Sequence, residues 1–328
     1  MPRRTRDPAA LVEAARAGDR AALARALSLV EQGGPAAREV GRLAHPHGGR
    51  AYTVGVTGAP GSGKSTLVSG LVGVVRADGD PVAVLAIDPS SPFTGGAILG
   101  DRVRMQDHAL DADVFIRSMA SRGHLGGLAL ATPQAVRLLD ASGVPWVFVE
   151  TVGVGQVEVE VAGAADTTLV VVNPGWGDAV QASKAGLLEV ADVFVVNKAD
   201  REGAAETRRD LEAMLELGAR REGAWRPAVV EAVATTGRGV EDVWAAVGRH
   251  RAHLEASGEL AERRFRRLVD ELRSIVARRL EERALEVLGG GGLESLQDEV
   301  VGRELDPWAA ADRVLSALEE GNGAPGRH

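Results

Sequence analysis

The sequence predicts an α/β fold in which a mostly parallel central sheet is flanked by helices on both faces. From Tyr52 onward, short β-branched runs alternate with helical stretches. The continuous apolar character of these runs is typical of parallel strands buried on both faces. Hydrophobic residues make up 45% of the 328 residues and aromatics only 3%. A large core is therefore expected, built mainly from Val, Leu and Ala.

Seven runs are expected to form the strands. They are Tyr52–Thr57, Val82–Ile87, Val114–Ile116, Trp146–Val149, Thr168–Val172, Val193–Val196 and Ala228–Val233. Helical stretches between them, at Leu67–Arg76, Pro133–Ser142 and Glu202–Leu217, are expected to cover the sheet. The alternation of strand and helix gives an α/β sandwich.

Helical segments are also expected at both ends of the chain. The first 45 residues are Ala-rich with helical periodicity, which predicts two short helices broken at Gly18-Asp19 and ending near Gly33-Gly34-Pro35. A long charged helix is expected from about Leu260 to Leu288, followed by a break at Gly289–Gly292 and a last helix, Leu305–Leu318. We therefore expect an N-terminal helical extension (1–48), a central domain (49–256) and a C-terminal helical arm (257–328), with a disordered end from Gly321.

Composition excludes several classes of function. The net charge of −8 disfavours nonspecific nucleic-acid binding. The chain has no cysteine, so disulfides, thiolate metal sites and thiol catalysis are excluded. No apolar run approaches the ~20 residues that a membrane span needs. We expect a cytoplasmic protein that binds neither nucleic acid nor membrane.

A phosphate-binding loop is predicted directly after the first strand. Its sequence fits the G-x-x-x-x-G-K-[ST] pattern between an apolar strand and a helix. In this loop, glycines let backbone N–H groups converge on phosphate oxygens, and the helix N-terminus adds partial positive charge. We expect Lys64 to reach the β- and γ-phosphates and the Ser65 hydroxyl to ligate Mg²⁺. The loop consists of Gly58, Ala59, Pro60, Gly61, Ser62, Gly63, Lys64, Ser65 and Thr66.

A guanine-recognition motif is predicted at Asn197-Lys198-Ala199-Asp200, at the end of a strand. The Asp200 carboxylate can accept hydrogen bonds from both N1–H and the exocyclic amine of guanine. Adenine lacks this donor pair, so a carboxylate there would be left unpaired. Lys198 can lie along the base plane. The loop Val233-Ala234-Thr235, after the next strand, is expected to close over the base through backbone groups. These motifs together predict binding of GTP and GDP.

Carboxylates at strand ends are candidates for the Mg²⁺ site. Glu150 ends the strand Trp146–Val149, and Gly153 follows it closely enough to meet the γ-phosphate. Asp88 also ends an apolar strand, and Asp101 lies in a glycine-rich segment. The candidate metal ligands are thus Ser65, Asp88, Asp101 and Glu150. For Asp101, a turn or helix-cap role is the alternative.

The residue after Gly153 bears on the rate of hydrolysis. Ras-like enzymes have at this position a glutamine that orients the attacking water. Here it is Val154, which cannot orient water, and Gln156 lies two residues further on. Slow intrinsic hydrolysis is expected, with a partner or a rearrangement completing the site.

Together these motifs resemble the MeaB/ArgK GTPases, the family that includes the human protein of methylmalonic aciduria type A. The resemblance extends over most of the chain and is most specific in two long central segments. The matching segments are Asp88–Pro92, Gly95–Met105, Glu150–Gln156, Gly177–Lys184 and Asn197–Asp200. The base-closing loop departs from the family, which often has Ser-Ala-Leu where this chain has Val233-Ala234-Thr235.

The resemblance implies a function and further site residues. Members of the family bind an adenosylcobalamin-dependent acyl-CoA mutase, gate loading of its cofactor, protect it and assist its reactivation. By the same resemblance, Asp88, Asp101 and Glu150 surround Mg²⁺ and the γ-phosphate, while Asp178 and Lys184 complete the catalytic site when the mutase docks. A homodimer formed through the C-terminal arm is also implied, with an apolar seam at Phe265, Leu268, Leu272, Ile275 and Val276; the alternative is a helix that packs on its own domain.

Two other functions are less compatible with the sequence. Some relatives carry names of arginine/ornithine transport-linked kinases, yet no base beside an acceptor pocket stands out in this sequence. A nickel-delivery GTPase is disfavoured because the chain has no cysteine, and only His45 and His47 lie close together among its histidines. The choice of mutase, whether methylmalonyl-, isobutyryl-, ethylmalonyl- or hydroxyisobutyryl-CoA mutase, has no sequence element that we can assign to it.

Overall fold

A computed structural model describes residues 6–89, 108, 110–121, 127–151, 163–175, 189–217 and 223–322. By its internal contacts the chain divides into two compact units, Met1–Arg267 and Leu268–His328. None of the helices within the described ranges is long and apolar enough to cross a bilayer.

Three helices open the first unit: α1 (Pro8–Arg16), α2 (Arg20–Gln32) and α3 (Gly34–Ala44). Asp19 caps α2, because its carboxylate accepts hydrogen bonds from the Ala21 and Ala22 amides at 2.8 and 3.0 Å. The expectation of only two helices was wrong. Gly33 does end α2, but Pro35 occupies the first turn of a third helix, where its missing N–H costs nothing. A single 3₁₀ turn, His45–His47, follows.

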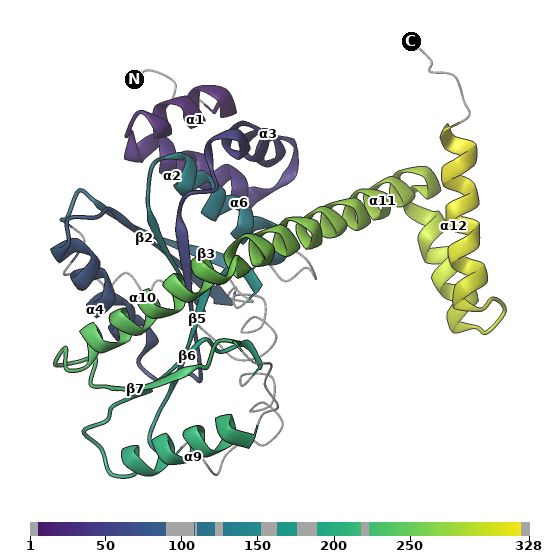
Figure 1. Ribbon diagram of the computed structural model, residues 1–328. Helices are drawn as coiled ribbons and strands as arrows, with labels where there is room; N and C mark the ends of the chain where they lie inside the picture. The colour runs from purple at the N-terminus through teal and green to yellow at the C-terminus, as the bar shows by residue number, and fades with distance from the viewer. Residues whose placement is uncertain are drawn as a thin grey trace. The chain divides into compact units, whose positions relative to one another are not determined.

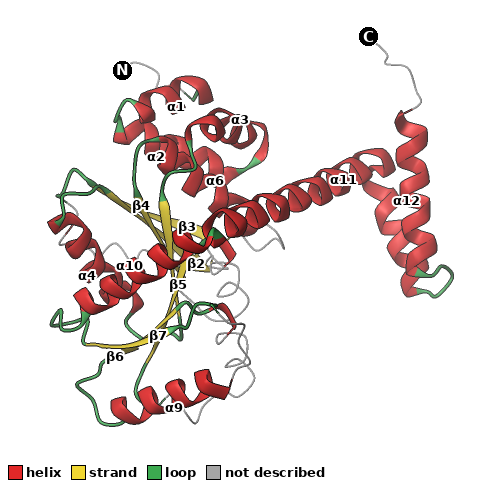
Figure 2. Ribbon diagram, viewed as in Figure 1, coloured by secondary structure: helices red, strands yellow, loops and turns green. Residues whose placement is uncertain are grey.

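Seven parallel strands form the central sheet (Figure 1, Figure 2). Their order is β3-β2-β4-β1-β5-β6-β7, and every neighbouring pair is parallel. The α/β fold and the seven strands predicted from the sequence are confirmed. Their bounds are β1 (Tyr52–Thr57), β2 (Val82–Pro89), β3 (Val114–Ser121), β4 (Trp146–Thr151), β5 (Thr167–Val172), β6 (Val193–Asn197) and β7 (Ala228–Ala232).

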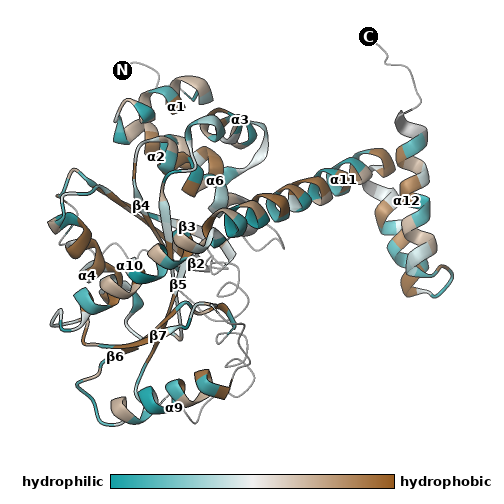
Figure 3. Ribbon diagram, viewed as in Figure 1, coloured by the Kyte–Doolittle hydropathy of each residue, from teal (hydrophilic) through white to brown (hydrophobic). Residues whose placement is uncertain are grey.

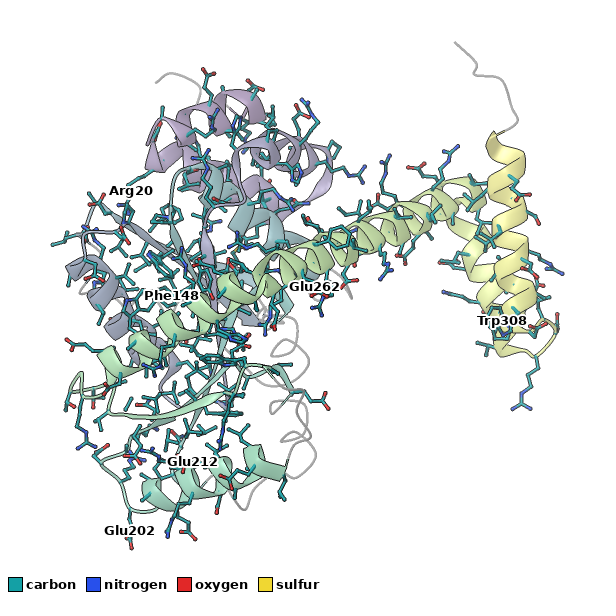
Figure 4. The ribbon with its side chains drawn as sticks, in the orientation of Figure 1. Arg20, Phe148, Glu202, Glu212, Glu262 and Trp308 are labelled. Carbon is teal, nitrogen blue, oxygen red and sulfur yellow. The ribbon has the colours of Figure 1, made fainter. Side chains whose placement is uncertain are left out.

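Helices cover both faces of the sheet. On one face α2, α3 and α6 (Gly127–Ala141) pack over β2, β3 and β4, and α9 (Ala204–Leu217) packs over β5 and β6. On the other face lie α4 (Lys64–Ala77) and α10 (Val240–Ser257). Neighbouring strand residues alternate between the two cores: Val147 faces the first and Phe148, which Figure 4 labels, faces the second. Most strand residues are apolar (Figure 3), with Arg117 of β3, Glu150 of β4 and Glu231 of β7 among the exceptions.

Helix α11 (Glu259–Val301) begins in the first unit and continues into the second, which also contains α12 (Pro307–Asn322). Within the second unit, Leu296 is buried and an Arg313 guanidinium nitrogen lies 2.7 Å from a Glu299 carboxylate oxygen. The expected break across four glycines is confined to one residue: Gly289 alone has non-helical angles (φ 69°, ψ 169°), and the helix resumes after it. The expected disorder from Gly321 falls mostly on residues outside those described.

Candidate nucleotide site

The loop between β1 and α4 needs glycine at two positions for reasons of space. Gly58 has φ +137°, and a Cβ on it would lie 2.1 Å from the Val171 carbonyl oxygen of β5. Gly63 has φ +91°, and a Cβ there would lie 2.3 Å from the Asn197 amide nitrogen. Both positions combine a backbone conformation that favours glycine with a contact that excludes a side chain. The loop is therefore packed directly against the carboxyl ends of β5 and β6.

Lys64, the first residue of α4, is folded over this loop. Its ammonium group donates hydrogen bonds to the Gly58 and Ala59 carbonyl oxygens at 2.6 and 3.1 Å. The side chain is almost fully buried. Its positive charge thus lies at the N-terminus of α4, where backbone N–H groups and the helix dipole already favour an anion. This arrangement can bind the phosphates of a nucleotide.

Ser65 and Glu150 meet beside the loop. The Ser65 hydroxyl donates to a Glu150 carboxylate oxygen at 2.5 Å, and both residues are buried. A hydroxyl and a carboxylate are oxygen donors of the type that Mg²⁺ prefers. The backbone of Asp88 lies one residue before the end of β2, and Ala86 of the same strand pairs with Glu150 of β4. These two described side chains, together with the position of Asp88 at the same sheet edge, fit a Mg²⁺ site.

The predicted guanine motif follows β6 and is tied to the phosphate loop. The Asn197 amide donates to the Ser62 carbonyl oxygen at 2.7 Å, although the two residues are separated by 135 positions. Lys198 adopts a left-handed backbone conformation (φ 57°), and its ammonium group donates to the Gly61 carbonyl oxygen at 2.6 Å. The next two residues form a turn that leaves Asp200 exposed. The Asp200 carboxylate is thus accessible to a base.

The base-closing loop also meets this motif. The Ala234 amide donates to the Asn197 side-chain oxygen at 3.1 Å, so one asparagine joins this loop to the phosphate loop. Val233 is buried, and its amide donates to the Arg238 carbonyl oxygen at 2.8 Å. Thr235 is exposed at the turn. Three segments distant in sequence are thereby brought together at one edge of the sheet.

Four predicted site residues lie outside the described residues: Asp101, Gly153, Asp178 and Lys184. The side chain of Asp88 is also outside them, so only its backbone is placed. Their roles stay predictions. Sequence reasoning missed the two-sided contact of Asn197 and the approach of Gly58 to β5. The glycine pattern of the loop signals close packing in general, but it does not identify the strand that is approached.

Comparisons with known proteins identify a family for this chain. The family model of the methylmalonyl Co-A mutase-associated GTPase MeaB matches residues 23–288. A protein of Pyrococcus abyssi, whose name assigns it as a GTPase, is 49% identical over 94% of this chain and 96% of its own length. The mouse mitochondrial homologue of the methylmalonic aciduria type A protein is 34% identical, over 75% of this chain and 64% of its own.

A solved structure is similar over nearly the whole chain. The crystal structure of an LAO/AO transport system kinase superposes with a TM-score of 0.73 at 28% identity, covering 97% of this chain and 100% of that one. The family match spans most of the sequence and includes both the phosphate loop and the guanine motif. The chain therefore belongs to the family of the methylmalonyl Co-A mutase-associated GTPase MeaB, and it is a GTPase.

Proposed function

We propose that this GTPase is a chaperone of an adenosylcobalamin-dependent acyl-CoA mutase of the methylmalonyl-CoA mutase type. In this proposal it gates loading of the cofactor, protects the mutase and assists its reactivation. The observation that carries the proposal is the match to a mutase-associated GTPase family over residues 23–288. The name of the mouse relative, a homologue of the methylmalonic aciduria type A protein, also points to methylmalonyl metabolism.

The nucleotide chemistry of the proposal is assigned to residues of this chain. Lys64 stabilises negative charge on the β- and γ-phosphates, and Asp200 reads the guanine edge. Ser65, Glu150, Asp88 and Asp101 would hold Mg²⁺, which when bound neutralises phosphate charge. The Gly153 amide is assigned to the γ-phosphate.

Hydrolysis by the isolated protein is proposed to be slow. Val154 stands where a water-orienting glutamine is found in Ras-like enzymes, and an isopropyl group cannot orient water. Asp178 and Lys184 are proposed to complete the site when the mutase docks. The rate of GTP hydrolysis would then depend on whether the mutase is bound.

Phosphate release measured with and without mutase tests the proposal. Purified protein with GTP and Mg²⁺ should turn over slowly alone and faster with one of the four candidate acyl-CoA mutases in its cofactor-free form. Lys64→Ala, which removes the phosphate-binding ammonium group, is the control that assigns the activity to this chain. No change of turnover with any of the four mutases would contradict the chaperone role.

A kinase that acts in arginine/ornithine transport is the second candidate function, because a similar solved structure bears a transport-kinase name. Transfer of the γ-phosphate to arginine or ornithine would show as radiolabelled amino acid. Release of inorganic phosphate alone excludes this candidate. The guanine motif favours the GTPase chaperone, since it specifies GTP rather than ATP.

A cytoplasmic homodimer completes the proposal. In the second unit Leu268, Leu272 and Val276 recur along α11 at helical spacing and are about half exposed. Apolar residues that recur every three or four positions form one stripe along a helix. A second copy of this chain is the proposed partner for that stripe.

A further inference from the structure

Two carboxylates lie at the edge of the sheet opposite the nucleotide site. Asp166 directly precedes β5 and Asp192 directly precedes β6. Both side chains are buried, and each is fixed by a strand amide: Thr53 donates to Asp166 at 3.0 Å and Thr168 donates to Asp192 at 2.9 Å. Two buried negative charges at this edge require partners.

The first turns of α11 supply three arginines to these carboxylates. Arg263 donates to Asp192 at 3.0 and 3.1 Å, Arg264 donates to Asp166 at 2.8 and 3.1 Å, and Arg267 also donates to Asp166. Guanidinium groups suit such contacts because their planar fork matches a carboxylate. These five residues are called the arginine clamp below.

The clamp reaches other parts of the first unit. Arg264 donates to the Gly49 and Ala51 carbonyl oxygens, both at 2.8 Å, and so holds the segment that enters β1. His250 of α10 is fully buried, with one ring nitrogen 3.2 Å from Asp192 and the other 2.8 Å from the Thr167 hydroxyl. The clamp thus contacts the segment that enters β1, and through His250 it is linked to α10 and to Thr167 of β5.

Charged contacts give less net stability than apolar packing of the same volume, but they specify a geometry. The start of α11, where Figure 4 labels Glu262, is therefore held in one orientation by charged contacts.

Strand β6 connects the clamp to the nucleotide site in five residues. It begins after Asp192 and ends at Asn197, whose side chain holds both the phosphate loop and the base-closing loop. Its apolar residues are fully buried on both faces, and a close-packed strand has little room to adjust one end without the other. Strand β5 makes a second connection, from Asp166 to the carbonyl of Val171 that Gly58 approaches.

We propose that binding of guanine nucleotide and docking of residues 259–267 through the arginine clamp are energetically coupled by β5 and β6. Because coupling between two sites is reciprocal, nucleotide stabilises the docked helix start, and an intact clamp raises nucleotide affinity by the same factor.

Hydrogen–deuterium exchange on the full chain tests one direction. In the presence of GDP, the backbone amides of residues 259–267 should exchange more slowly than in its absence. This measurement uses the unaltered protein, so it does not depend on a variant that folds. Unchanged exchange of these amides at saturating GDP overturns the proposal.

Titration of GDP tests the other direction. Arg263→Gln should weaken GDP binding by about fivefold or more, at the lower limit of typical coupling. Arg266→Gln is the matched control, because Arg266 lies on the same turns but is 63% exposed and pairs only with Glu262 in the contacts described. If Arg263→Gln and the unaltered protein bound GDP with equal affinity, even with faster exchange of residues 259–267 in the variant, the clamp would hold the helix without affecting nucleotide binding. That result would overturn the proposal. Equal weakening in both variants would indicate a general charge effect and also overturns the proposal. No mutase is present in these assays, so their outcome is independent of the proposed chaperone role.

Discussion

Asp200 is the residue on which nucleotide specificity depends most directly. Its exposed carboxylate follows a strand end that is tied to the phosphate loop through Asn197. Asp200→Asn replaces an acceptor by an amide that can donate, so the variant should prefer a xanthine nucleotide. GTP affinity should fall on the order of a hundredfold or more, because a donor on the protein would then face a donor on the base. Competition of GDP and xanthosine diphosphate measures this, with Asp210→Asn as the exposed control; unchanged GTP affinity would refute the base-reading role.

Gly63 is a second residue at which the structure predicts that a substitution weakens nucleotide binding. Alanine there meets the Asn197 amide nitrogen at 2.3 Å and is strained at φ +91°. Strain of about 1–3 kcal/mol in the loop corresponds to a loss of roughly five- to 150-fold in affinity. Gly79→Ala is the matched control, since Gly79 has φ +88° with nothing within 4 Å of an added Cβ. If calorimetric titration gave both variants the same GDP affinity, the contact with Asn197 would have no role in binding.

At the scale of elements, the apolar runs predicted all seven strands because buried parallel strands have no polar face to obscure them. The third helix of the extension was missed because Gly33-Gly34-Pro35 has the composition of a terminator. It ends one helix and begins the next. The phosphate and guanine motifs were predictable because each is a short contiguous segment. The arginine clamp was not, since Asp192 and Arg263 are separated by 71 positions and meet only in the fold.

The attachment of α2 to β3 gives an element-scale prediction. Arg117 on β3 donates to Glu31 at 2.8 Å and to Ser28 at 3.1 Å, and both charged side chains are less than one-fifth exposed. Glu31→Gln leaves the arginine without its counter-charge and should destabilise the unit by about 1 kcal/mol, a value reduced for partial solvent screening. Urea unfolding measures the shift. Glu39→Gln, which alters a pair on the surface of α3, should leave the midpoint in place; equal shifts would contradict the prediction.

At the scale of the whole molecule, the clamp carboxylates contribute to acid sensitivity. Burial raises the pKa of Asp166 and of Asp192, but hydrogen bonds from Arg264 and His250 and the nearby arginine charges outweigh it. Each pKa therefore lies below the usual 3.8. A carboxyl group whose pKa is lowered in the folded state stabilises the protein at pH values above its unfolded-state pKa. This stabilisation is lost as the pH falls through the folded-state pKa.

The free energy of unfolding should accordingly hold between pH 7 and 5 and fall below about pH 4. Asp192→Asn removes one of these groups, so the variant should be less stable at pH 7 and should lose less stability on acidification. Urea titrations at pH 7, 5, 4 and 3 measure both slopes. Asp78→Asn, at an exposed helix end, should follow the unaltered protein. An Asp192→Asn slope equal to that of the unaltered chain would exclude this carboxylate as a source of the acid dependence.

Association of two chains is the last whole-molecule property that the structure makes testable. Leu272 is 59% exposed within the apolar stripe of α11, and burial of such a stripe against a second copy would remove it from water. Leu272→Glu places a charge in that interface and should convert a dimer into a monomer, as measured by light scattering at micromolar concentration. Ala277→Glu adds the same charge about 140° around the helix, at ~100° per residue, and should leave the dimer intact. A monomeric mass for the unaltered protein would refute the homodimer. Dissociation of both variants would show that charge on α11, rather than the apolar stripe, controls assembly.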